Sequence, residues 1–408
     1  MSTMQRPALA DLANPATLPD PYPLLAGLRE ASPFADFDGA FVVAGRHADI
    51  SAVLRDPDAS SERDRSRLAA TAPRRANPRP SFLSLDPPDH TRLRRLVSKA
   101  FTPRRIALLE PRIQEITGGL LGAAAAAGQL EVVSQLAYPL PVRIISELLG
   151  VPVEDHPRFA GWSARLAHSL QPGFGLTPAE AQTRAESAQA ASDEFAAYFR
   201  GLIAMRRARP ADDLLSAMVR AEDNGEMLTE DELIATCVLL LVAGHETTVG
   251  LISNAILALL RHPDQLALLQ ADPDLAAAAV EETLRYDAPV QMTGRVAKGP
   301  VLVGRLTADE GALVLLLLAA AGRDPDVYPD PDRFDIRRGA AGHLAFAAGP
   351  HFCLGAPLAR LEATVAVRAF ATRMTAPELD EDMLAYKPNL NLRGPEQMVV
   401  RFQAHARG

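Results

Sequence analysis

One long apolar helix is the feature that most constrains the fold of this chain. Thr229 and Glu232 form the Thr-x-x-Glu pattern of a capping box, which predicts that a helix begins here. The helical pattern continues to Arg261, and Pro263 ends it. At ~1.5 Å per residue such a helix is roughly 50 Å long, enough to cross a whole domain. Small and polar residues at its centre, 243–248, conflict with the apolar pattern, and such conflicts tend to mark functional sites.

Helical patterns also dominate the rest of the chain. Amphipathic stretches predict helices over residues 103–127, 178–209 and 358–374. Strand patterns are few, and the best are residues 41–44, 301–303, 313–318 and 398–402. The sequence therefore predicts a mainly α fold with a small β region, as a single domain over residues 1–408 with residues 1–10 as a disordered tail. Two loops without periodicity, 71–84 and 171–177, are candidates to gate a pocket.

Charge and cysteine content exclude several classes of protein. The net charge of −8 argues against a general nucleic-acid binder. Two cysteines, Cys237 and Cys353, cannot build a disulfide framework, which favours a reducing cytoplasm. The N-terminus lacks the layout of a signal peptide, and the longest apolar runs, 233–244 and 312–322, fall short of the ~20 residues that span a bilayer. We therefore expect an unanchored cytoplasmic protein.

Cys353 lies between a glycine-rich stretch and a helical pattern. The free amides of a helix N-terminus stabilise a thiolate and lower the pKa of the thiol, and a thiolate binds soft metals. Gly349 and Gly355 allow the backbone to approach a flat ligand, and Phe346 can shield the sulfur from water. A lone cysteine would more often be structural, but the surrounding pattern favours a metal ligand here.

Residues 346–355 resemble the haem-binding signature of the cytochromes P450, Phe-x-x-Gly-x-x-x-Cys-x-Gly, at every fixed position. The similarity extends over about residues 11–402. The resemblance implies a triangular helical prism, haem b as the cofactor, Cys353 as the iron ligand, and Phe346 and Gly355 beside the haem. It also implies a monooxygenase that activates O₂ with two electrons and hydroxylates or epoxidises an apolar small molecule.

The centre of the long helix matches a second family pattern, Ala/Gly-Gly-x-Asp/Glu-Thr-Thr, at residues 243–248. By this resemblance Thr247 hydrogen-bonds dioxygen or an adjacent water, and Glu246 passes in the two protons that O–O cleavage requires. Ala243 and Gly244 are expected against the haem, where Gly244 lacks the Cβ that would crowd oxygen. In isolation, the same motif could be a polar helix face packed on water. His245 is expected to point away from the Thr247 face.

Glu282 and Arg285 lie three residues apart and share one helix face. In the P450 family such a Glu-x-x-Arg pair is buried on the thiolate side of the haem and joins a downstream arginine, which by resemblance is Arg333. This is a structural ion network, and losing one partner of a buried pair costs about 3–5 kcal/mol. As a bare motif it would equally fit a solvated surface pair.

The two propionates of haem need cationic partners. The resemblance places four candidates at the expected positions, namely His90, Arg94, Arg295 and His351. His90 and Arg94 lie four apart on one helix face, and arginine suits carboxylates through its fork geometry. Each residue alone could be an ordinary surface charge.

A local run of basic residues stands out in this acidic chain: Arg92, Arg94, Arg95, Lys99, Arg104 and Arg105. It is either a solvated helix face or a docking patch for an acidic electron donor. The chain contains no flavin or iron–sulfur segment, so the resemblance implies a separate ferredoxin and ferredoxin reductase. We expect the protein itself to be a monomer.

The substrate has no readable code in the sequence. Candidate pocket residues are mostly apolar and lie near the expected haem site: Phe82, Leu83, Leu239, Ala243, Val290 and Met292. Related proteins often modify secondary metabolites, which is analogy only. Two alternatives stay open: a haem-thiolate enzyme that uses peroxide or catalyses oxidative coupling or desaturation, and a haem carrier or sensor without catalysis.

Overall fold

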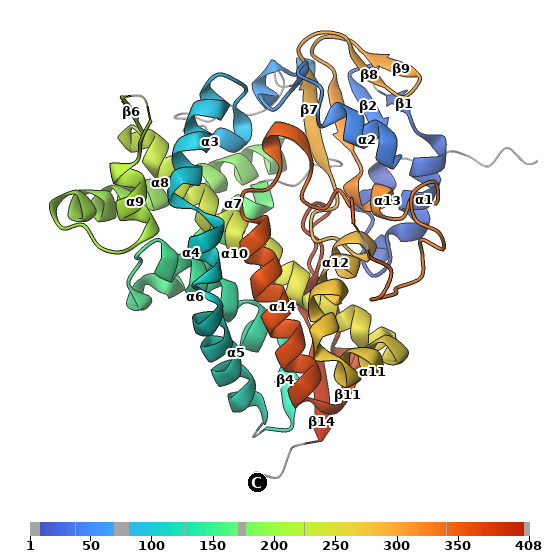
Figure 1. Ribbon diagram of the computed structural model, residues 1–408. Helices are drawn as coiled ribbons and strands as arrows, with labels where there is room; N and C mark the ends of the chain where they lie inside the picture. The colour runs from blue at the N-terminus through green and yellow to red at the C-terminus, as the bar shows by residue number, and fades with distance from the viewer. Residues whose placement is uncertain are drawn as a thin grey trace, which may run out of the picture.

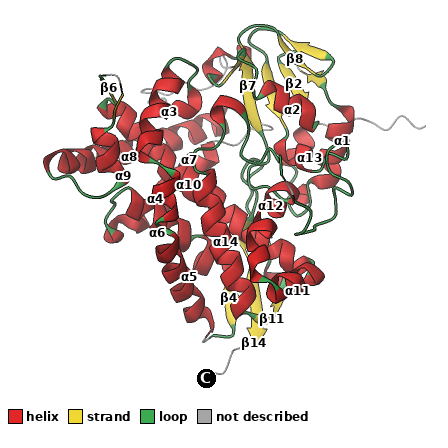
Figure 2. Cartoon of the chain, viewed as in Figure 1, coloured by secondary structure: helices red, strands yellow, loops and turns green. Residues whose placement is uncertain are grey.

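The computed structural model describes residues 9–36, 38–68, 81–125, 127–169, 177–223, 225–339 and 341–403. Helices form most of the molecule, with most of the strands in two groups and the short strand β6 apart from them, near α8 and α9 (Figures 1 and 2). The helices are α1 (Tyr22–Ala31), α2 (His47–Val53), α3 (Asp89–Ala100), α4 (Pro103–Ala107), α5 (Glu110–Ala125), α6 (Pro139–Leu148), α7 (His156–Ser169), α8 (Pro178–Ala208), α9 (Leu214–Arg220), α10 (Glu230–Arg261), α11 (Pro263–Ala271), α12 (Ala276–Tyr286), α13 (Leu318–Gly322) and α14 (Ala356–Arg373). The strands are β1 (Phe34–Asp36), β2 (Phe41–Ala44), β3 (Ala59–Ser60), β4 (Gln129–Glu131), β5 (Glu222–Asp223), β6 (Glu226–Met227), β7 (Thr293–Ala297), β8 (Val301–Val303), β9 (Leu306–Ala308), β10 (Leu313–Leu316), β11 (Thr375–Leu379), β12 (Ala385–Tyr386), β13 (Pro395–Gln397) and β14 (Val399–Gln403). The predicted mainly α fold with a small β region is confirmed.

Helix α10 is the predicted central helix. The hydroxyl of Thr229 accepts the backbone N–H of Glu232, and the Glu232 carboxylate accepts the N–H of Thr229, so the capping box is complete. The helix packs against α6, α8, α12 and α14. It is long and apolar enough to cross a bilayer, but 67% of its most apolar window is buried by the rest of the fold. It therefore serves as the core helix of the described structure.

The predicted helix over residues 103–127 is in fact two helices. Thr102 caps α4 by accepting the N–H of Arg105, and α4 ends at Ala107. A new helix, α5, begins at Glu110. The break follows from Pro111, because its ring would clash with the carbonyl four residues earlier and it has no N–H to donate. The predicted helices over 178–209 and 358–374 are confirmed as α8 and α14 to within two residues.

The larger sheet has the strand order β1-β2-β10-β7-β3. Strand β10 is parallel to β2 and antiparallel to β7, which pairs Val314 with Arg295. A second sheet, β11-β14-β4, joins the C-terminus to the segment after α5. The predicted strands match β2, β8, β10 and β14, although β10 ends at Leu316 because Leu318 begins α13. Strand β7 of the larger sheet, which contains Arg295, lies beside the helical body (Figure 1).

Parts of three sequence predictions lie outside the described residues. These are residues 1–8 of the expected tail, 71–80 of the first candidate gating loop and 171–176 of the second. The end of the first loop is described, and Phe82–Ser84 forms a short 3₁₀ turn just before α3.

Candidate functional site

Cys353 lies in a tight loop directly before α14. Its N–H donates to the carbonyl of Phe346 at 3.0 Å, which closes the loop. Gly349 has φ +68°, and a Cβ there would lie 2.3 Å from the carbonyl oxygen of Leu54, so glycine is required both for the turn and for the close approach. The loop therefore holds the sulfur at a fixed place against the rest of the fold.

The surroundings of the Cys353 sulfur differ in part from the sequence expectation. Burial raises the pKa of the Cys353 thiol, and this outweighs the opposing effect of the backbone N–H groups of Gly355 and Ala356 and of the Arg94 and Arg360 guanidinium groups. The expected lowering of the pKa by the helix N-terminus is thus present but is not the larger effect. A partly buried sulfur that faces two N–H donors and two guanidinium groups suits a thiolate whose proton has been replaced by a metal ion.

Three of the four candidate propionate partners gather in one buried cluster. The rings of His90 (α3) and His351 (the cysteine loop) lie 4.0 Å apart, and Nε2 of His351 lies 3.0 Å from Oγ of Ser61. Among the described residues neither ring nitrogen of His90 has a hydrogen-bond partner, although the residue is 2% exposed. Arg295 is also buried, and its guanidinium donates to the carbonyl of Gly294 at 2.9 Å.

The positively charged forms of Arg295 and His351 are destabilised in this cluster. Burial and the like charge of Arg63 lower the pKa of Arg295 to about 10, although the Asp86 carboxylate acts in the opposite direction. Burial and the nearby His90 and Arg295 lower the pKa of His351 to about 3. Buried donors and cations without an anion cost free energy, and two carboxylates are the groups that would satisfy them. The residues present therefore fit a ligand that carries two carboxylates beside Cys353.

Arg94, the fourth candidate, points to the cysteine loop. Its guanidinium donates to the carbonyl of Phe352, and burial lowers its pKa although Cys353 acts in the opposite direction. It lies one helical turn after His90 on α3, as predicted. The sequence did not identify Ser61, because a single serine in a loop carries no distinguishing signal.

The centre of α10 presents Ala243 and Thr247 on one face. Ala243 is exposed although it lies in the middle of a core helix, so this face borders an open space. The Thr247 hydroxyl donates to the carbonyl of Ala243 at 2.8 Å. The structure corrects the expectation for Gly244, because a Cβ there would contact Ile145 of α6 at 3.4 Å and would not face the Ala243 side. Gly244 therefore serves helix packing.

Glu246 is held by two other side chains. Its Oε2 lies 3.1 Å from Nζ of Lys387, and its Oε1 lies 3.5 Å from Nε2 of His245. Burial by itself would raise the pKa of Glu246, but His245 and Lys387 lower it to about 2. The sequence did not identify Lys387, since 141 residues separate the two partners. His245 is buried in the helix packing, where its Nδ1–H donates to the carbonyl of Leu241.

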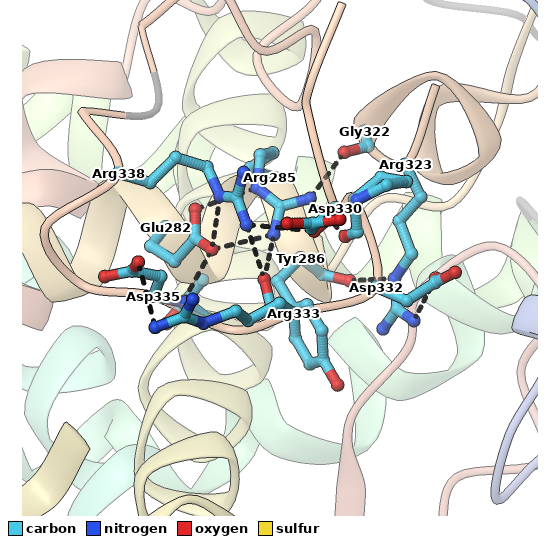
Figure 3. A network of polar contacts seen from close by, with 12 residues as sticks. Glu282, Arg285, Tyr286, Gly322, Arg323, Asp330, Asp332, Arg333, Asp335 and Arg338 are labelled. Atoms are coloured by element: carbon cyan, nitrogen blue, oxygen red, sulfur yellow. Dashed lines mark hydrogen bonds and ion pairs between the residues drawn. The ribbon is translucent and has the colours of Figure 1, made fainter. Parts of the chain in front are cut away.

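The Glu282 carboxylate organises a network of buried charges (Figure 3). Arg285 donates to both carboxylate oxygens at 2.7 and 2.8 Å, and both side chains are at most 1% exposed. The third partner is Arg338 at 3.2 Å and not the expected Arg333. The Arg333 guanidinium is 64% exposed and faces Asp335, and Arg333 joins the network through its carbonyl, which accepts from Arg285 and Arg338. Residues 333, 337 and 338 are all arginines, and spacing alone does not distinguish them.

The candidate substrate residues are only partly brought together. Ala243 borders the open face of α10, and Leu239 lies one turn before it. Phe82 packs near the ring of His90, whereas Leu83 is half exposed. Val290 pairs with Leu392, and Met292 is buried in a cluster with the N-terminal segment. Val290 therefore belongs to a wall formed with the C-terminal loop, whereas Met292 is packed into the N-terminal cluster.

Comparisons with known proteins agree with this geometry. A family model described as Cytochrome P450 matches residues 181–373. The chain is 45% identical over 397 residues to the cytochrome P450 monooxygenase PikC of Streptomyces venezuelae, which covers 94% of this chain and 91% of that one. It is 42% identical over 401 residues to the vitamin D(3) 25-hydroxylase of Pseudonocardia autotrophica, covering 96% of both chains. The crystal structure of Mycobacterium smegmatis CYP164A2 with econazole bound matches with a TM-score of 0.88 at 46% identity, covering 96% of this chain and 99% of that one.

Similarity at this level over nearly the whole chain agrees with a partly buried cysteine beside a cluster of cationic and donor groups that suits two carboxylates. The cofactor is accordingly haem b, and the class of reaction is monooxygenation. The chain belongs to the cytochrome P450 family.

Proposed function

We propose that the protein uses Cys353 as the thiolate ligand of its haem iron and oxidises a bulky apolar molecule with electrons from a separate ferredoxin. The observation that carries this proposal is a loop-fixed, partly buried sulfur beside the His90 ring, which has no hydrogen-bond partner among the described residues, and the buried Arg295 guanidinium. When bound, the haem supplies the reductive activation of O₂ and the transfer of one oxygen atom to the substrate.

The protein groups act around that chemistry. The N–H groups of Gly355 and Ala356 stabilise negative charge on the Cys353 sulfur. His90, Arg94, Arg295 and His351 bind the two propionates, and a carboxylate beside His351 would raise its lowered pKa and favour the protonated donor.

Thr247 and Glu246 supply protons to the open face of α10. The Thr247 hydroxyl now donates to the Ala243 carbonyl, and a single χ1 rotation turns it towards the space that Ala243 borders. The Glu246 carboxyl group passes protons into the interior, and Lys387 holds this group near Thr247. Ala243 and Gly355 leave room for the cofactor and the substrate.

The substrate is proposed to be an apolar molecule of the size of a steroid or macrocycle. Leu239, Ala243 and the wall at Val290 supply apolar surface for such a molecule. One relative is named a vitamin D(3) 25-hydroxylase, which makes vitamin D₃ a first compound to test. Titration of the purified protein with vitamin D₃ and with macrolactones, followed by the haem absorption shift, would identify ligands that displace water from the iron.

The test of the iron ligand is spectroscopic. The reduced protein with carbon monoxide should show the red-shifted absorption band of a thiolate ligand, and Cys353→Ser should abolish that band. Cys237→Ser is the matched control, because Cys237 is buried in the hydrophobic core and should leave the band unchanged. Persistence of the band in Cys353→Ser would disprove the assignment.

The electron donor is proposed to dock beside α3 and the cysteine loop. Much of the basic run is already engaged within the protein: Arg92 pairs with Glu232, Lys99 donates to the Glu222 carbonyl and Arg105 pairs with Asp212. The side chain of Arg95 is 46% exposed and lies 4.0 Å from the Glu226 carboxylate. The neighbouring Phe352 and Leu108 are exposed apolar side chains. This mixture suits a transient partner of opposite charge, and we expect the enzyme to act as a cytoplasmic monomer.

A further inference from the structure

The loop of residues 387–394, which joins β12 to β13, connects two parts of the site. Its first residue, Lys387, donates through Nζ to Glu246 of α10 at 3.1 Å. The backbone N–H of Lys387 donates to the carbonyl of Gly394 at 3.1 Å, which closes the loop on itself. Oδ1 of Asn389 accepts the N–H groups of Asn391 and Leu392 and stiffens the turn between them. The ammonium group that holds Glu246 is therefore carried by a compact, internally bonded loop.

The same loop forms one piece with the proposed substrate wall after α12. The N–H of Gln291 donates to the carbonyl of Asn391 at 2.9 Å, and the N–H of Arg393 donates to the carbonyl of Pro289 at 2.7 Å. Between these two bonds, Val290 and Leu392 form an antiparallel bridge. A displacement of the wall at Val290 would therefore also displace loop 387–394.

The end of the loop crosses α10 at very close range. A Cβ on Gly250 would lie 2.8 Å from the carbonyl oxygen of Arg393, and one on Gly394 would lie 3.2 Å from Cα of Gly250. Gly250 is three residues after Thr247, so the crossing is one helical turn from the oxygen-facing threonine. The loop therefore touches α10 both at the Glu246 carboxylate and one turn beyond it.

The other titratable groups around Glu246 do not replace Lys387. The nearest is His245, whose Nε2 lies 3.5 Å from Oε1 of Glu246 and makes no hydrogen bond. The Nδ1–H of His245 is already donated to the Leu241 carbonyl, and Nε2 at 3.5 Å lies farther from the Glu246 carboxylate than Nζ of Lys387 at 3.1 Å. Tyr138 of the segment before α6 packs edge-on against the His245 ring at 5.9 Å. In the described structure the hydrogen-bond donor to Glu246 is thus Lys387.

We propose that Lys387 is a positioning residue of the proton supply: it holds Glu246 against loop 387–394, and a ligand that fills the pocket and displaces this loop releases Glu246 towards Thr247. The inference rests on the proposed function, because it takes Glu246 as the proton carrier and Val290 as part of the pocket wall. Its consequence is that the acid is withheld while the pocket is empty and is made available when the pocket is filled.

Ligand binding and breaking of the Lys387–Glu246 ion pair are thermodynamically linked in this proposal, so measurements of ligand affinity alone can test it. If a ligand must break the Lys387–Glu246 ion pair to enter the pocket, breaking the pair weakens the binding of that ligand. A variant without the pair must therefore bind the ligand more tightly, by the factor that the ion pair costs the wild type. The probe is econazole, which is bound in the solved structure of a relative and whose coordination of the haem iron shifts the absorption spectrum. Its dissociation constant is measured for the wild-type holoenzyme, Lys387→Met, Glu246→Gln and the double variant.

Each single variant should bind econazole at least about fivefold more tightly than the wild type, the low end of typical coupling between sites. The double variant should bind no more tightly than either single variant, and Lys387→Arg should restore the wild-type value. The matched control is Arg261→Met, which removes a cation that contacts Tyr386, the residue next to Lys387, but does not touch Glu246. This control should keep the wild-type affinity.

Three results would overturn the inference: unchanged affinity in both single variants, weaker affinity in either of them, or additive gains in the double variant. The carbon monoxide band of each variant is recorded first. A wild-type protein without the red-shifted band would refute the proposed iron ligand. If the band is intact but the econazole dissociation constant is the same in all variants, only the role of Lys387 is refuted. A variant that loses the band by misfolding is replaced by Lys387→Gln, for which the same tightening is expected.

Discussion

The Glu282 network gives the sharpest test of the structure, because it separates two arginines five residues apart. Arg338 is 13% exposed on its side chain, and it bonds the buried Glu282 carboxylate as well as the carbonyls of Pro329, Asp330 and Arg333. Arg333 has an exposed guanidinium, and only its backbone takes part. Arg338→Met should therefore destabilise the fold, and Arg333→Met should not.

The size of the effect follows from what remains after the substitution. Breaking a buried ion pair costs about 3–5 kcal/mol when one charge is left uncompensated. In Arg338→Met, Glu282 keeps both bonds from Arg285 and the N–H of Asp335 at 2.9 Å, so the loss should be at the lower end, about 3 kcal/mol. The pair of Arg333 with Asp335 is exposed at 3.6 Å, and its loss should cost less than about 0.5 kcal/mol.

Urea denaturation of the holoenzyme, followed by far-ultraviolet circular dichroism, measures both changes. An unfolding entropy of ~2.1 cal/mol/K per residue over 408 residues converts about 3 kcal/mol into a melting temperature lower by roughly 3 °C. The variants should share one m-value, since the surface exposed on unfolding is the same. Equal destabilisation by the two substitutions, or a larger loss for Arg333→Met, would refute the assignment of Arg338 to the network.

Three further predictions test the charges and the backbone of the site. The free energy of unfolding of Glu246→Gln should be lower than that of the wild type at pH 7. The difference should shrink as pH falls from about 4.5 towards about 2, because the folded-state pKa of Glu246 is depressed to about 2. A difference that grows on acidification would contradict the ion pair. Gly349→Ala should lose haem during purification, since its Cβ would collide with the Leu54 carbonyl, whereas Gly342→Ala, at a similarly positive φ but with open space around the Cβ, should retain it. Equal haem content in the two variants would show that the close approach is unimportant. Arg95→Glu should slow reduction by a ferredoxin at low salt and approach the wild-type rate at high salt, as measured by stopped-flow absorbance; an unchanged rate at low salt would remove this residue from the docking surface.

Local sequence was sufficient for several parts of this protein. The capping box at Thr229 and the apolar period after it predicted α10 to within one residue, because both signals depend on neighbours in the chain. The glycine spacing around Cys353 pointed to a constrained loop, and Gly349 has the positive φ that such a loop requires. The division between α4 and α5 was also present in the sequence as Pro111, but the amphipathic period continued across it and concealed the break.

Pairing over long distances was decided by the tertiary structure alone. Arg338 rather than Arg333 reaches Glu282 because of the path that the chain takes after Asp330, and no local pattern encodes that path. The turn of Gly244 towards α6 depends on how two helices pack. Lys387 meets Glu246 because loop 387–394 is bonded to the wall at Pro289 and Gln291. The sequence by itself determined which chemical groups are present and which local elements carry them. The partner of each buried charge was determined by packing between segments far apart in the chain, because a buried charge is satisfied by whichever group the fold brings within a few ångströms.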